Sequence, residues 1–170
     1  MAARAAKFVS LPALLRKRPG WRRAGKTVVF TNGIFDLLHR GHVEYLAEAK
    51  RQGDILIVGM NSDTSARKLK GRGRPINKLA DRAAVLAGLA AVDYIVPFGG
   101  PTPIQLITAI RPEVLVKGSE YRKADIVGAA EVESWGGTVA RVRMRRGKST
   151  TALVQKIGRL VSADVIADGS

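Results

Sequence analysis

Residues 26–42 of the chain read KTVVFTNGIFDLLHRGH. The segment from Val28 to Thr31 is apolar and largely β-branched, and it predicts a short buried strand that ends at Asn32-Gly33. A glycine directly after a strand lets a phosphate group approach the backbone amides, which a side chain would obstruct. The stretch therefore predicts a strand, a turn and a helix start that together bind phosphate groups.

Beyond this stretch the chain alternates strand-like and helical segments. The apolar run at residues 54–60 is typical of a strand covered on both faces, and with the strand at 26–31 and a helix at 41–51 it forms a βαβ unit. The other elements we expect are helices at 63–69, 79–90, 103–110, 125–135 and 149–160, and strands at 93–96, 112–117 and 138–142. The pattern predicts an α/β fold, a Rossmann-like, open, mainly parallel sheet with helices on both faces.

The length of 170 residues predicts one globular domain with a core of its own. We expect it over residues 26–161, preceded by a basic extension over 1–25 and followed by a flexible tail over 162–170. The absence of cysteine fits a reducing cytoplasm and excludes a disulfide scaffold or a thiolate metal site. No apolar run approaches the roughly 20 residues that span a bilayer, so we expect a cytoplasmic protein without a membrane partner.

The formal net charge of +15 indicates a polyanionic partner. Basic residues cluster around residues 67–74 and 141–148, and neither cluster is interleaved with the aromatic side chains that stack single-stranded nucleic acid. This distribution favours a phosphate-lined pocket and makes nucleic acid the less favoured partner.

Polar residues follow three of the predicted strands. They are Asn32-Gly33, Asn61-Ser62-Asp63 and Lys117-Gly118. Ligands of open parallel sheets bind beyond the carboxyl ends of the strands, at a topological switch point. We therefore expect these residues to lie along one rim of the sheet and to form the binding site.

Both histidines of the chain, His39 and His42, stand at the predicted helix start and are spaced to share one face of its first turn. Imidazoles near a helix N-terminus donate hydrogen bonds to phosphate oxygens and stabilise charge that develops on a leaving group. Gly41 between them permits close approach of a bulky ligand. The alternatives are a surface helix start and a metal clip, but a zinc site needs a third protein ligand, for which only carboxylates remain. We favour phosphate binding and expect no metal ligands.

The stretch from Thr31 to His42 resembles the signature of the cytidylyltransferase-like nucleotidyltransferases, with a T-x-G-x-F-D turn and an H-x-G-H motif. Within that superfamily the chain is most similar to the branch that adenylylates D-glycero-β-D-manno-heptose 1-phosphate, here without the kinase domain of the bifunctional members. The further matches lie at residues 58–63, 69–77, 81–82, 115–118 and 149–151, so the resemblance covers about residues 26–160. Val154 stands where many members have an arginine, and we expect Arg145, Arg146 or Lys148 to supply that charge.

The resemblance implies a role for each matching residue. His39 and His42 would bind the nucleotide phosphates and stabilise the transition state, with Lys70 as a third catalytic residue. The residues implied on the nucleotide side are Thr31, Asn32, Gly33, Phe35, Gly41, Lys117, Gly118, Arg145, Ser149 and Thr150. Those implied on the sugar phosphate side are Asn61, Asp63, Arg74 and Arg82, with Lys70 helping to offset the repulsion between the two anions.

The implied reaction is in-line attack of a sugar 1-phosphate oxygen on the α-phosphorus of ATP, releasing pyrophosphate with the help of Mg²⁺. The product would be ADP-heptose, a lipopolysaccharide core precursor, and the family-level expectation for the assembly is a homodimer. Two alternatives stay open. One is a relative that uses CTP with a small polyol or amino-alcohol phosphate, and the other is a basic nucleic-acid-binding protein on an inactive fold of this kind.

Several of these residues also have purely structural interpretations. Ser149 suits a helix N-cap, Arg82 suits a solvated charge on a helix, and Asp36 suits a brace for its turn rather than a metal contact. Tyr94 and Trp135 lie on apolar faces and are expected in the core.

Overall fold

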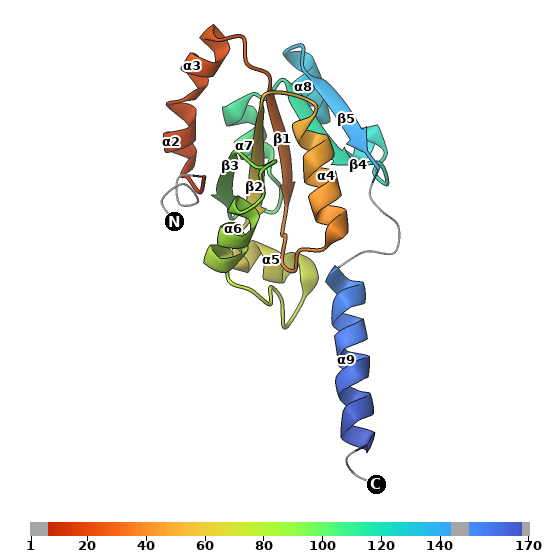
Figure 1. Ribbon diagram of the computed structural model, residues 1–170. Helices are drawn as coiled ribbons and strands as arrows, with labels where there is room; N and C mark the ends of the chain where they lie inside the picture. Colours follow the sequence, from red (N-terminus) through yellow and green to blue (C-terminus); the bar gives the residue numbers. More distant parts are fainter. Residues whose placement is uncertain (1–6, 144–149, 168–170) are drawn as a thin grey trace.

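The computed structural model describes residues 7–143 and 150–167. Five strands alternate with helices along this part of the chain (Figure 1). The strands are β1 Val28–Gly33, β2 Ile55–Asn61, β3 Tyr94–Phe98, β4 Val114–Gly118 and β5 Thr138–Val142. The helices are α2 Leu11–Leu15, α3 Arg18–Arg23, α4 Arg40–Lys50, α5 Asp63–Lys70, α6 Leu79–Ala87, α7 Ile104–Ile110, α8 Ala129–Ser134 and α9 Thr150–Ala167, with a 3₁₀ turn at Lys123–Asp125.

All five strands are parallel, in the order β3-β2-β1-β4-β5. The chain builds outward from β1 through β2 to β3 and then crosses back to add β4 and β5 on the other side of β1. The switch point therefore lies between β1 and β4, where the doubly wound architecture leaves a crevice at the carboxyl ends of the strands. The predicted open, parallel α/β sheet is confirmed.

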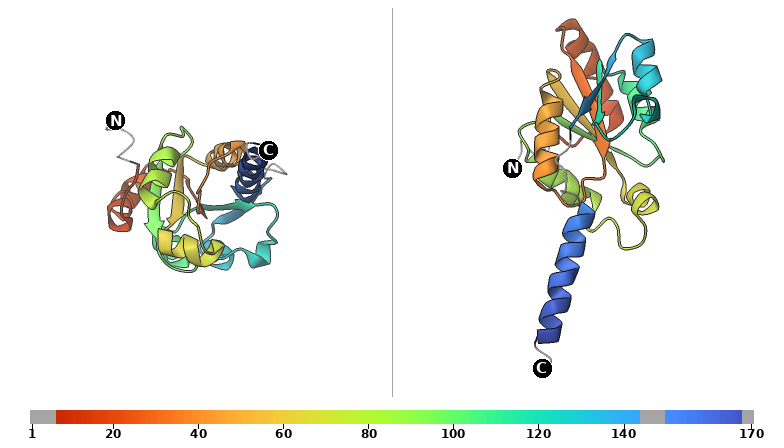
Figure 2. Two further views of the ribbon diagram at one scale, coloured as in Figure 1. Left: turned by 90° about the horizontal axis from the view of Figure 1, so that it is seen from below. Right: turned by 90° about the vertical axis from the view of Figure 1, so that its right-hand side faces the viewer.

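Alternate residues of the central strand feed two separate cores. Val29 packs with residues of α4 and α6 on one face of the sheet, whereas Val28 and Phe30 pack with residues of α2, α7 and α8 on the other. Figures 1 and 2 show these helices on opposite faces. A side-chain period of two sends successive residues to opposite faces, so the unbroken apolar run in β1 is explained by a sheet that is covered on both sides.

The helix expected over residues 125–135 forms only at Ala129–Ser134, after the 3₁₀ turn and an extended Ile126. Gly128 interrupts it with a φ of 89°, a left-handed conformation that favours glycine. A Cβ at that position would lie 2.6 Å from the Ile107 side chain, so the loop also needs a glycine for its close approach to α7. Ile126 is buried in the core as a result.

The closing helix α9 runs to Ala167 and is longer than the helix expected over 149–160, so most of the segment expected as a tail is helical. It projects away from the sheet in both side views (Figures 1 and 2). Its apolar side chains Ile157, Leu160 and Val161 are exposed. No helix in the described ranges has the length and apolarity needed to cross a bilayer.

The basic segment before β1 packs against the domain, although we expected it as an extension outside it. Val9 donates its backbone N–H to Ile95 O at 3.0 Å, and Ile95 donates its own to Lys7 O at 2.8 Å, so this segment adds a bridge to the free edge of β3. Leu14 is fully buried in the core on the α7 side. The segment is basic in composition, but its apolar residues complete one face of the sheet.

Candidate active site at the carboxyl ends of the strands

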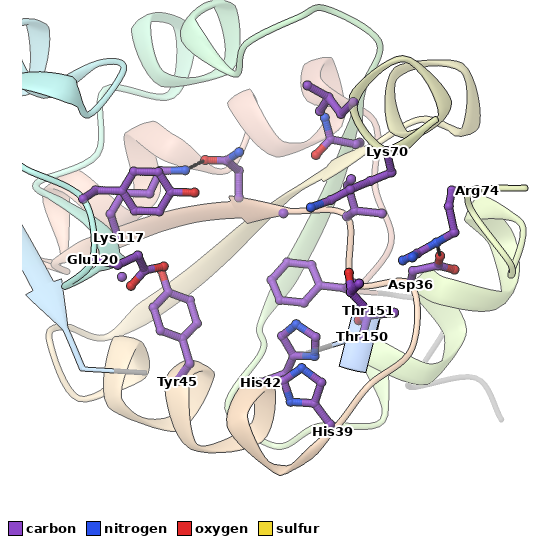
Figure 3. Close-up of a pocket in the computed structure, with 18 residues that line it drawn as sticks. Asp36, His39, His42, Tyr45, Lys70, Arg74, Lys117, Glu120, Thr150 and Thr151 are labelled. Atoms are coloured by element: carbon purple, nitrogen blue, oxygen red, sulfur yellow. Dashed lines mark hydrogen bonds and ion pairs between the residues drawn. The ribbon is translucent and has the colours of Figure 1, made fainter. Parts of the chain in front are cut away.

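A pocket of about 720 Å³ opens where β1, β2 and β4 end (Figure 3). The described residues that line it are Asn32, Gly33, Ile34, Phe35, Asp36, His39, His42, Tyr45, Asn61, Leu69, Lys70, Arg74, Lys117, Gly118, Glu120, Tyr121, Thr150 and Thr151. The three predicted strand ends thus meet at one rim, and the histidine pair faces the same space.

The pocket reaches into the sheet because β1 and β4 pair over a short distance. Their register contains only Val29 with Val114 and Phe30 with Leu115, so the strands separate toward their carboxyl ends. Tyr45 of α4 lies at this separation and donates its hydroxyl proton to Val116 O at 3.2 Å. Burial raises the pKa of Tyr45, which keeps the phenol protonated as a bridge between the strands.

Thr31 belongs to this bridge and not to the pocket wall. Its side chain is fully buried, and its hydroxyl lies 2.8 Å from the Tyr45 hydroxyl. Because the Tyr45 proton is used on Val116 O, Thr31 is the donor of this bond. Thr31 was expected to contact the nucleotide, but its position beneath the pocket makes it a support for the β1–β4 crevice.

The turn after β1 brings an aromatic ring against the end of the strand. Phe35 adopts a φ of 49°, an unusual conformation for a bulky residue, which indicates a turn held by its surroundings. Its ring would lie 2.8 Å from a Cβ on Gly33, so only a glycine fits there without displacing the ring. The edge of the same ring meets the His42 imidazole at a centroid distance of 5.3 Å. Gly33 and Phe35 therefore form one wall of the pocket, as the sequence predicts.

The two histidines stack at the start of α4. His39 is the N-cap residue in extended conformation, and His42 lies in the first turn of the helix. Their ring centroids are 3.9 Å apart with an interplanar angle of 19° (Figure 3). The helix start adds outward-facing backbone N–H groups and the positive end of the helix dipole. Gly41 between them is buried within α4 and does not line the pocket, so it permits packing of the helix rather than ligand contact.

The His42 imidazole is neutral at neutral pH. Burial and the nearby His39 lower its pKa to about 4. A neutral imidazole has one N–H donor and one acceptor nitrogen. Its Nδ1 is buried and has no hydrogen-bond partner among the described residues. An arriving phosphate would favour the protonated ring and so raise this pKa, because a nearby opposite charge stabilises the charged form.

Lys117 is the penultimate residue of β4 and reaches across the crevice to β1. Its ammonium donates a hydrogen bond to Asn32 Oδ1, and its Nζ lies 6.0 Å from the centroid of the Tyr121 ring. Burial lowers the pKa of Lys117 to about 8, although the neighbouring Glu120 carboxylate acts in the opposite direction. The Lys117 ammonium group therefore places a positive charge at the switch point, and this group titrates just above neutral pH.

If Lys117 contacts the nucleotide, as the resemblance implies, kcat/KM for the nucleotide should fall as pH rises through about 8, because deprotonation removes the Lys117 charge from the free protein. The fall approaches tenfold per pH unit on the alkaline side. Lys117→Arg should abolish this limb, since a guanidinium stays charged throughout the range. The test is a pH–rate profile from about 6.5 to 9.5. The exposed Lys68→Arg serves as control, and identical alkaline limbs in wild type and Lys117→Arg would contradict the prediction.

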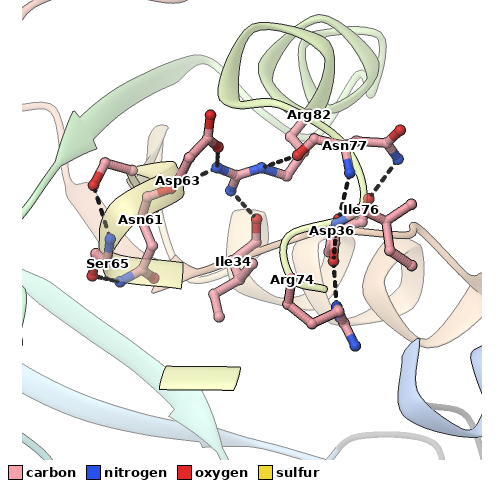
Figure 4. Close-up of polar contacts among 10 residues, drawn as sticks. Ile34, Asp36, Asn61, Asp63, Ser65, Arg74, Ile76, Asn77 and Arg82 are labelled. Atoms are coloured by element: carbon pink, nitrogen blue, oxygen red, sulfur yellow. Dashed lines mark hydrogen bonds and ion pairs between the residues drawn. The ribbon is translucent and has the colours of Figure 1, made fainter. Parts of the chain in front are cut away.

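Arg74 is held at the pocket by Asp36. The carboxylate accepts a 2.7 Å hydrogen bond from Arg74 Nε and further bonds from the backbone N–H groups of Ile76 and Asn77 (Figure 4). Burial would raise the pKa of Asp36, but these hydrogen bonds outweigh it and lower the pKa. Asp36 is therefore an ionised brace for the turn, which agrees with its structural interpretation, and it positions Arg74 against the pocket.

Arg82 lies outside the pocket, contrary to both interpretations of this residue. Its side chain is fully buried and donates to three backbone carbonyl oxygens and to Asp63 Oδ1 at 2.7 Å (Figure 4). The carbonyls are those of Ile34 at 2.6 Å, Asn61 at 2.9 Å and Asn77 at 3.1 Å. Arg82 is thus neither a sugar phosphate contact nor a solvated charge but ties the β1 turn to the end of β2. Asp63 is its counter-ion and likewise does not line the pocket.

The start of α9 closes another side of the pocket. Thr150 donates its hydroxyl to Leu37 O at 3.1 Å, and both Thr150 and Thr151 line the cavity. The predicted contacts Arg145 and Ser149, and the alternatives Arg146 and Lys148, lie outside the described residues.

The pocket also contains residues that the sequence did not assign to the site, among them Tyr45, Glu120 and Tyr121. A usable signal existed for Tyr45, which follows His42 by one helical turn and so shares its face. Glu120 and Tyr121 follow Lys117-Gly118 in the loop after β4. Their closeness to a strand end was the only feature of the sequence that indicated a place in the pocket. Their inward direction depends on the path of that loop.

Comparison with known proteins places these residues in a family. The family model described as cytidylyltransferase-like matches residues 30–162. A bifunctional protein HldE of Methylobacillus flagellatus is 49% identical over 156 residues, which cover 92% of this chain and 32% of that protein. The HldE protein of Wolinella succinogenes is 54% identical over 89% of this chain and 31% of its own length. The chain thus spans about a third of these relatives.

A solved structure supports the same placement. The lipopolysaccharide core biosynthesis protein from Thermoplasma volcanium superposes with a TM-score of 0.60 at 28% sequence identity, covering 73% of this chain and 100% of that protein. The family model begins within β1 and includes the turn and the histidine pair described above. The chain belongs to the cytidylyltransferase-like family.

Proposed function

We propose that this protein transfers AMP from ATP to D-glycero-β-D-manno-heptose 1-phosphate, giving ADP-heptose and pyrophosphate for lipopolysaccharide core synthesis. The observation that carries the proposal is the stacked pair His39 and His42 at a helix start, facing a switch-point pocket that also holds Lys70, Arg74 and Lys117. The likeness to HldE proteins and to a lipopolysaccharide core biosynthesis protein supports the choice of substrate.

The proposed reaction needs no nucleophile from the protein. An oxygen of the sugar 1-phosphate attacks the α-phosphorus of ATP and forms a new P–O bond, while the bond to the oxygen bridging to the β-phosphorus breaks. Pyrophosphate leaves with that electron pair. The imidazole N–H groups of His39 and His42 stabilise the charge on the leaving group. Such stabilisation by preorganised hydrogen-bond donors is usually the largest single contribution to the rate enhancement.

The cations of the pocket bring two anions together. Lys70, at the end of α5, and Arg74 line the same wall, and in our proposal they hold the sugar phosphate and offset its repulsion from ATP. Asn61 is the sugar-side residue at the end of β2. Lys117, Gly118 and Thr150 meet the nucleotide on the other side, with Asn32, Gly33 and Phe35 as its phosphate wall. Positioning the two reactants in this geometry by itself lowers the activation free energy of the reaction.

The described side chains that line the pocket do not form a Mg²⁺ site of their own, so Mg²⁺ would arrive bound to the phosphates of ATP. The described residues contain no group of three His, Asp or Glu side chains placed to hold a metal. The Asp36 carboxylate is already occupied by Arg74 and two backbone N–H groups. Mg²⁺ commonly keeps several waters and binds through substrate phosphates, where it neutralises charge. We therefore treat MgATP as the substrate.

The decisive experiment measures pyrophosphate release from ATP, CTP and GTP, each combined with a panel of sugar, polyol and amino-alcohol phosphates. We expect turnover with ATP and the β-anomer of the heptose 1-phosphate and little with its α-anomer. Turnover with CTP and a polyol phosphate instead would establish the alternative function. Absence of turnover with ATP and the heptose 1-phosphate would overturn the proposal. Light scattering on the same sample measures whether the protein is the expected homodimer.

A further inference from the structure

A second cavity, of about 450 Å³, lies between the N-terminal helices and the end of α7. It is lined by Leu15, Arg18, Pro19, Arg22, Arg23, Ala109, Ile110 and Arg111. Arg18 bonds to the backbone just before β4 begins, so this cavity lies at the amino ends of the strands. The candidate active site lies at their carboxyl ends, and the two cavities share no lining residue.

The second cavity has an excess of positive charge. Four of its lining residues are arginines, and no acidic residue is among the described residues that line it. Glu113, which is nearby, pairs with Arg18 at 2.8 Å and accepts the backbone N–H of Val28 with its other oxygen. Within the described ranges, Arg22, Arg23 and Arg111 have no ion pair. Their exposed guanidinium groups can therefore take up an anion from solution.

Arg18 is a buried cation with an unused donor. The residue is only 8% exposed. Its Nε donates to Ile110 O at 2.8 Å, and its Nη2 donates to Arg111 O and to Glu113. Its Nη1 is buried and has no hydrogen-bond partner among the described residues. A buried donor left without an acceptor is unfavourable, and an ordered water or an anion that reaches this nitrogen would satisfy it.

The shape and chemistry of the cavity define its ligand. Guanidinium groups bind phosphate with paired N–H donors, which suits a terminal phosphate group better than a single carboxylate. The remaining lining side chains, Leu15, Pro19, Ala109 and Ile110, are apolar. The volume falls within the roughly 300–1,000 Å³ that is usual for small-molecule sites. An open cavity with an apolar wall beside its arginines fits a small organic phosphate better than the extended, uniformly charged backbone of a nucleic acid.

We propose that this cavity is a second binding site, separate from nucleotidyl transfer, that takes a small organic phosphate: its phosphate group contacts Arg18, Arg22, Arg23 and Arg111, and its apolar part lies against Leu15 and Ile110.

Trp135 reports on this site through its contact with Arg111, which lines the cavity. Trp21 belongs to α3, and the Arg111 guanidinium lies 5.1 Å from the centroid of the Trp135 ring. Neither tryptophan lines the candidate active site. An anion bound to Arg111 would withdraw the cation from the Trp135 ring and change its fluorescence. Titration of the protein with butyl phosphate should therefore give a saturable change in tryptophan emission.

Arg22→Ser/Arg23→Ser should weaken butyl phosphate binding at least tenfold while pyrophosphate release at the other end of the sheet stays unchanged. The matched control is Arg16→Ser/Arg159→Ser, which removes the same charge from two exposed arginines outside the cavity and should bind like wild type. Equal weakening in both variants would show unspecific charge attraction and overturn the proposal. So would the absence of saturable binding, or binding of a single-stranded oligonucleotide in place of butyl phosphate.

Discussion

Replacing His42 with alanine is expected to lower turnover about 100-fold or more while the fold stays intact, because one fixed donor to a developing oxyanion contributes on this scale. The ring stacks on His39 at a centroid distance of 3.9 Å and contacts Phe35 at 5.3 Å, so it is held in one orientation before substrate arrives. Its low pKa, about 4, leaves it neutral in the free protein. The loss should appear mainly in kcat, since the contact strengthens in the transition state.

Two measurements separate chemistry from packing at this position. Steady-state pyrophosphate release gives kcat and KM, and circular dichroism with urea unfolding reports on the fold. Val43→Ala is a suitable control, because Val43 is the next residue of α4 but points outward with 44% exposure. Activity of His42→Ala within about threefold of wild type would show that the pair is structural and would remove the main support for the proposed reaction.

Replacing Arg82 with methionine is expected to destabilise the protein by about 3 kcal/mol, chiefly because buried backbone carbonyls lose their donor at a cost of about 1–3 kcal/mol each. The pair with Asp63, which is 38% exposed, contributes less. The change leaves Asp63 without its counter-ion and leaves three backbone carbonyls without their donor. Arg82→Lys should rescue little of this, since a single ammonium cannot reach the oxygens that the planar guanidinium bridges. Urea unfolding monitored by tryptophan fluorescence measures the difference.

Two controls keep this prediction testable. Arg67→Met changes an exposed arginine of α5 and should alter stability by no more than about 0.5 kcal/mol. Asp63→Asn keeps the carbonyl contacts of Arg82 and should cost less than Arg82→Met, which provides a folded variant if the latter fails to fold. A raised KM for the sugar phosphate with unchanged stability in Arg82→Met would contradict the structural role and restore Arg82 to the substrate side.

The local pattern of the sequence predicted much of the fold. The βαβ unit from residue 26 to residue 60 and the strand at 138–142 agree with β1, α4, β2 and β5, because apolar periodicity and breaker residues act over a few neighbours. The helix over 125–135 was misjudged because the left-handed conformation of Gly128 follows from its contact with Ile107 on another helix. When packing against another helix overrides the helix propensity of a segment, the sequence of that segment does not show it.

The candidate site divides in the same way. Asn32, Lys117 and the histidine pair were placed correctly at the pocket, because strand ends meet at one edge of any parallel sheet. Arg82 was misplaced because its charge suggested solvent or substrate. Its partners, Ile34 O and Asn61 O, lie 48 and 21 residues away along the chain.

The sequence by itself determined the alternation of strands and helices, the turn at Gly33 and the placing of both histidines at one helix start, since each depends on residues adjacent in the chain. Only the tertiary structure decided which cations face the pocket. Lys117 lies against Asn32 and Arg74 against Asp36, while Arg82 is enclosed and the N-terminal arginines border a second cavity. The reason is physical: burial and pairing are set by segments that meet in space, and these determine whether a charge binds a ligand or holds the fold together.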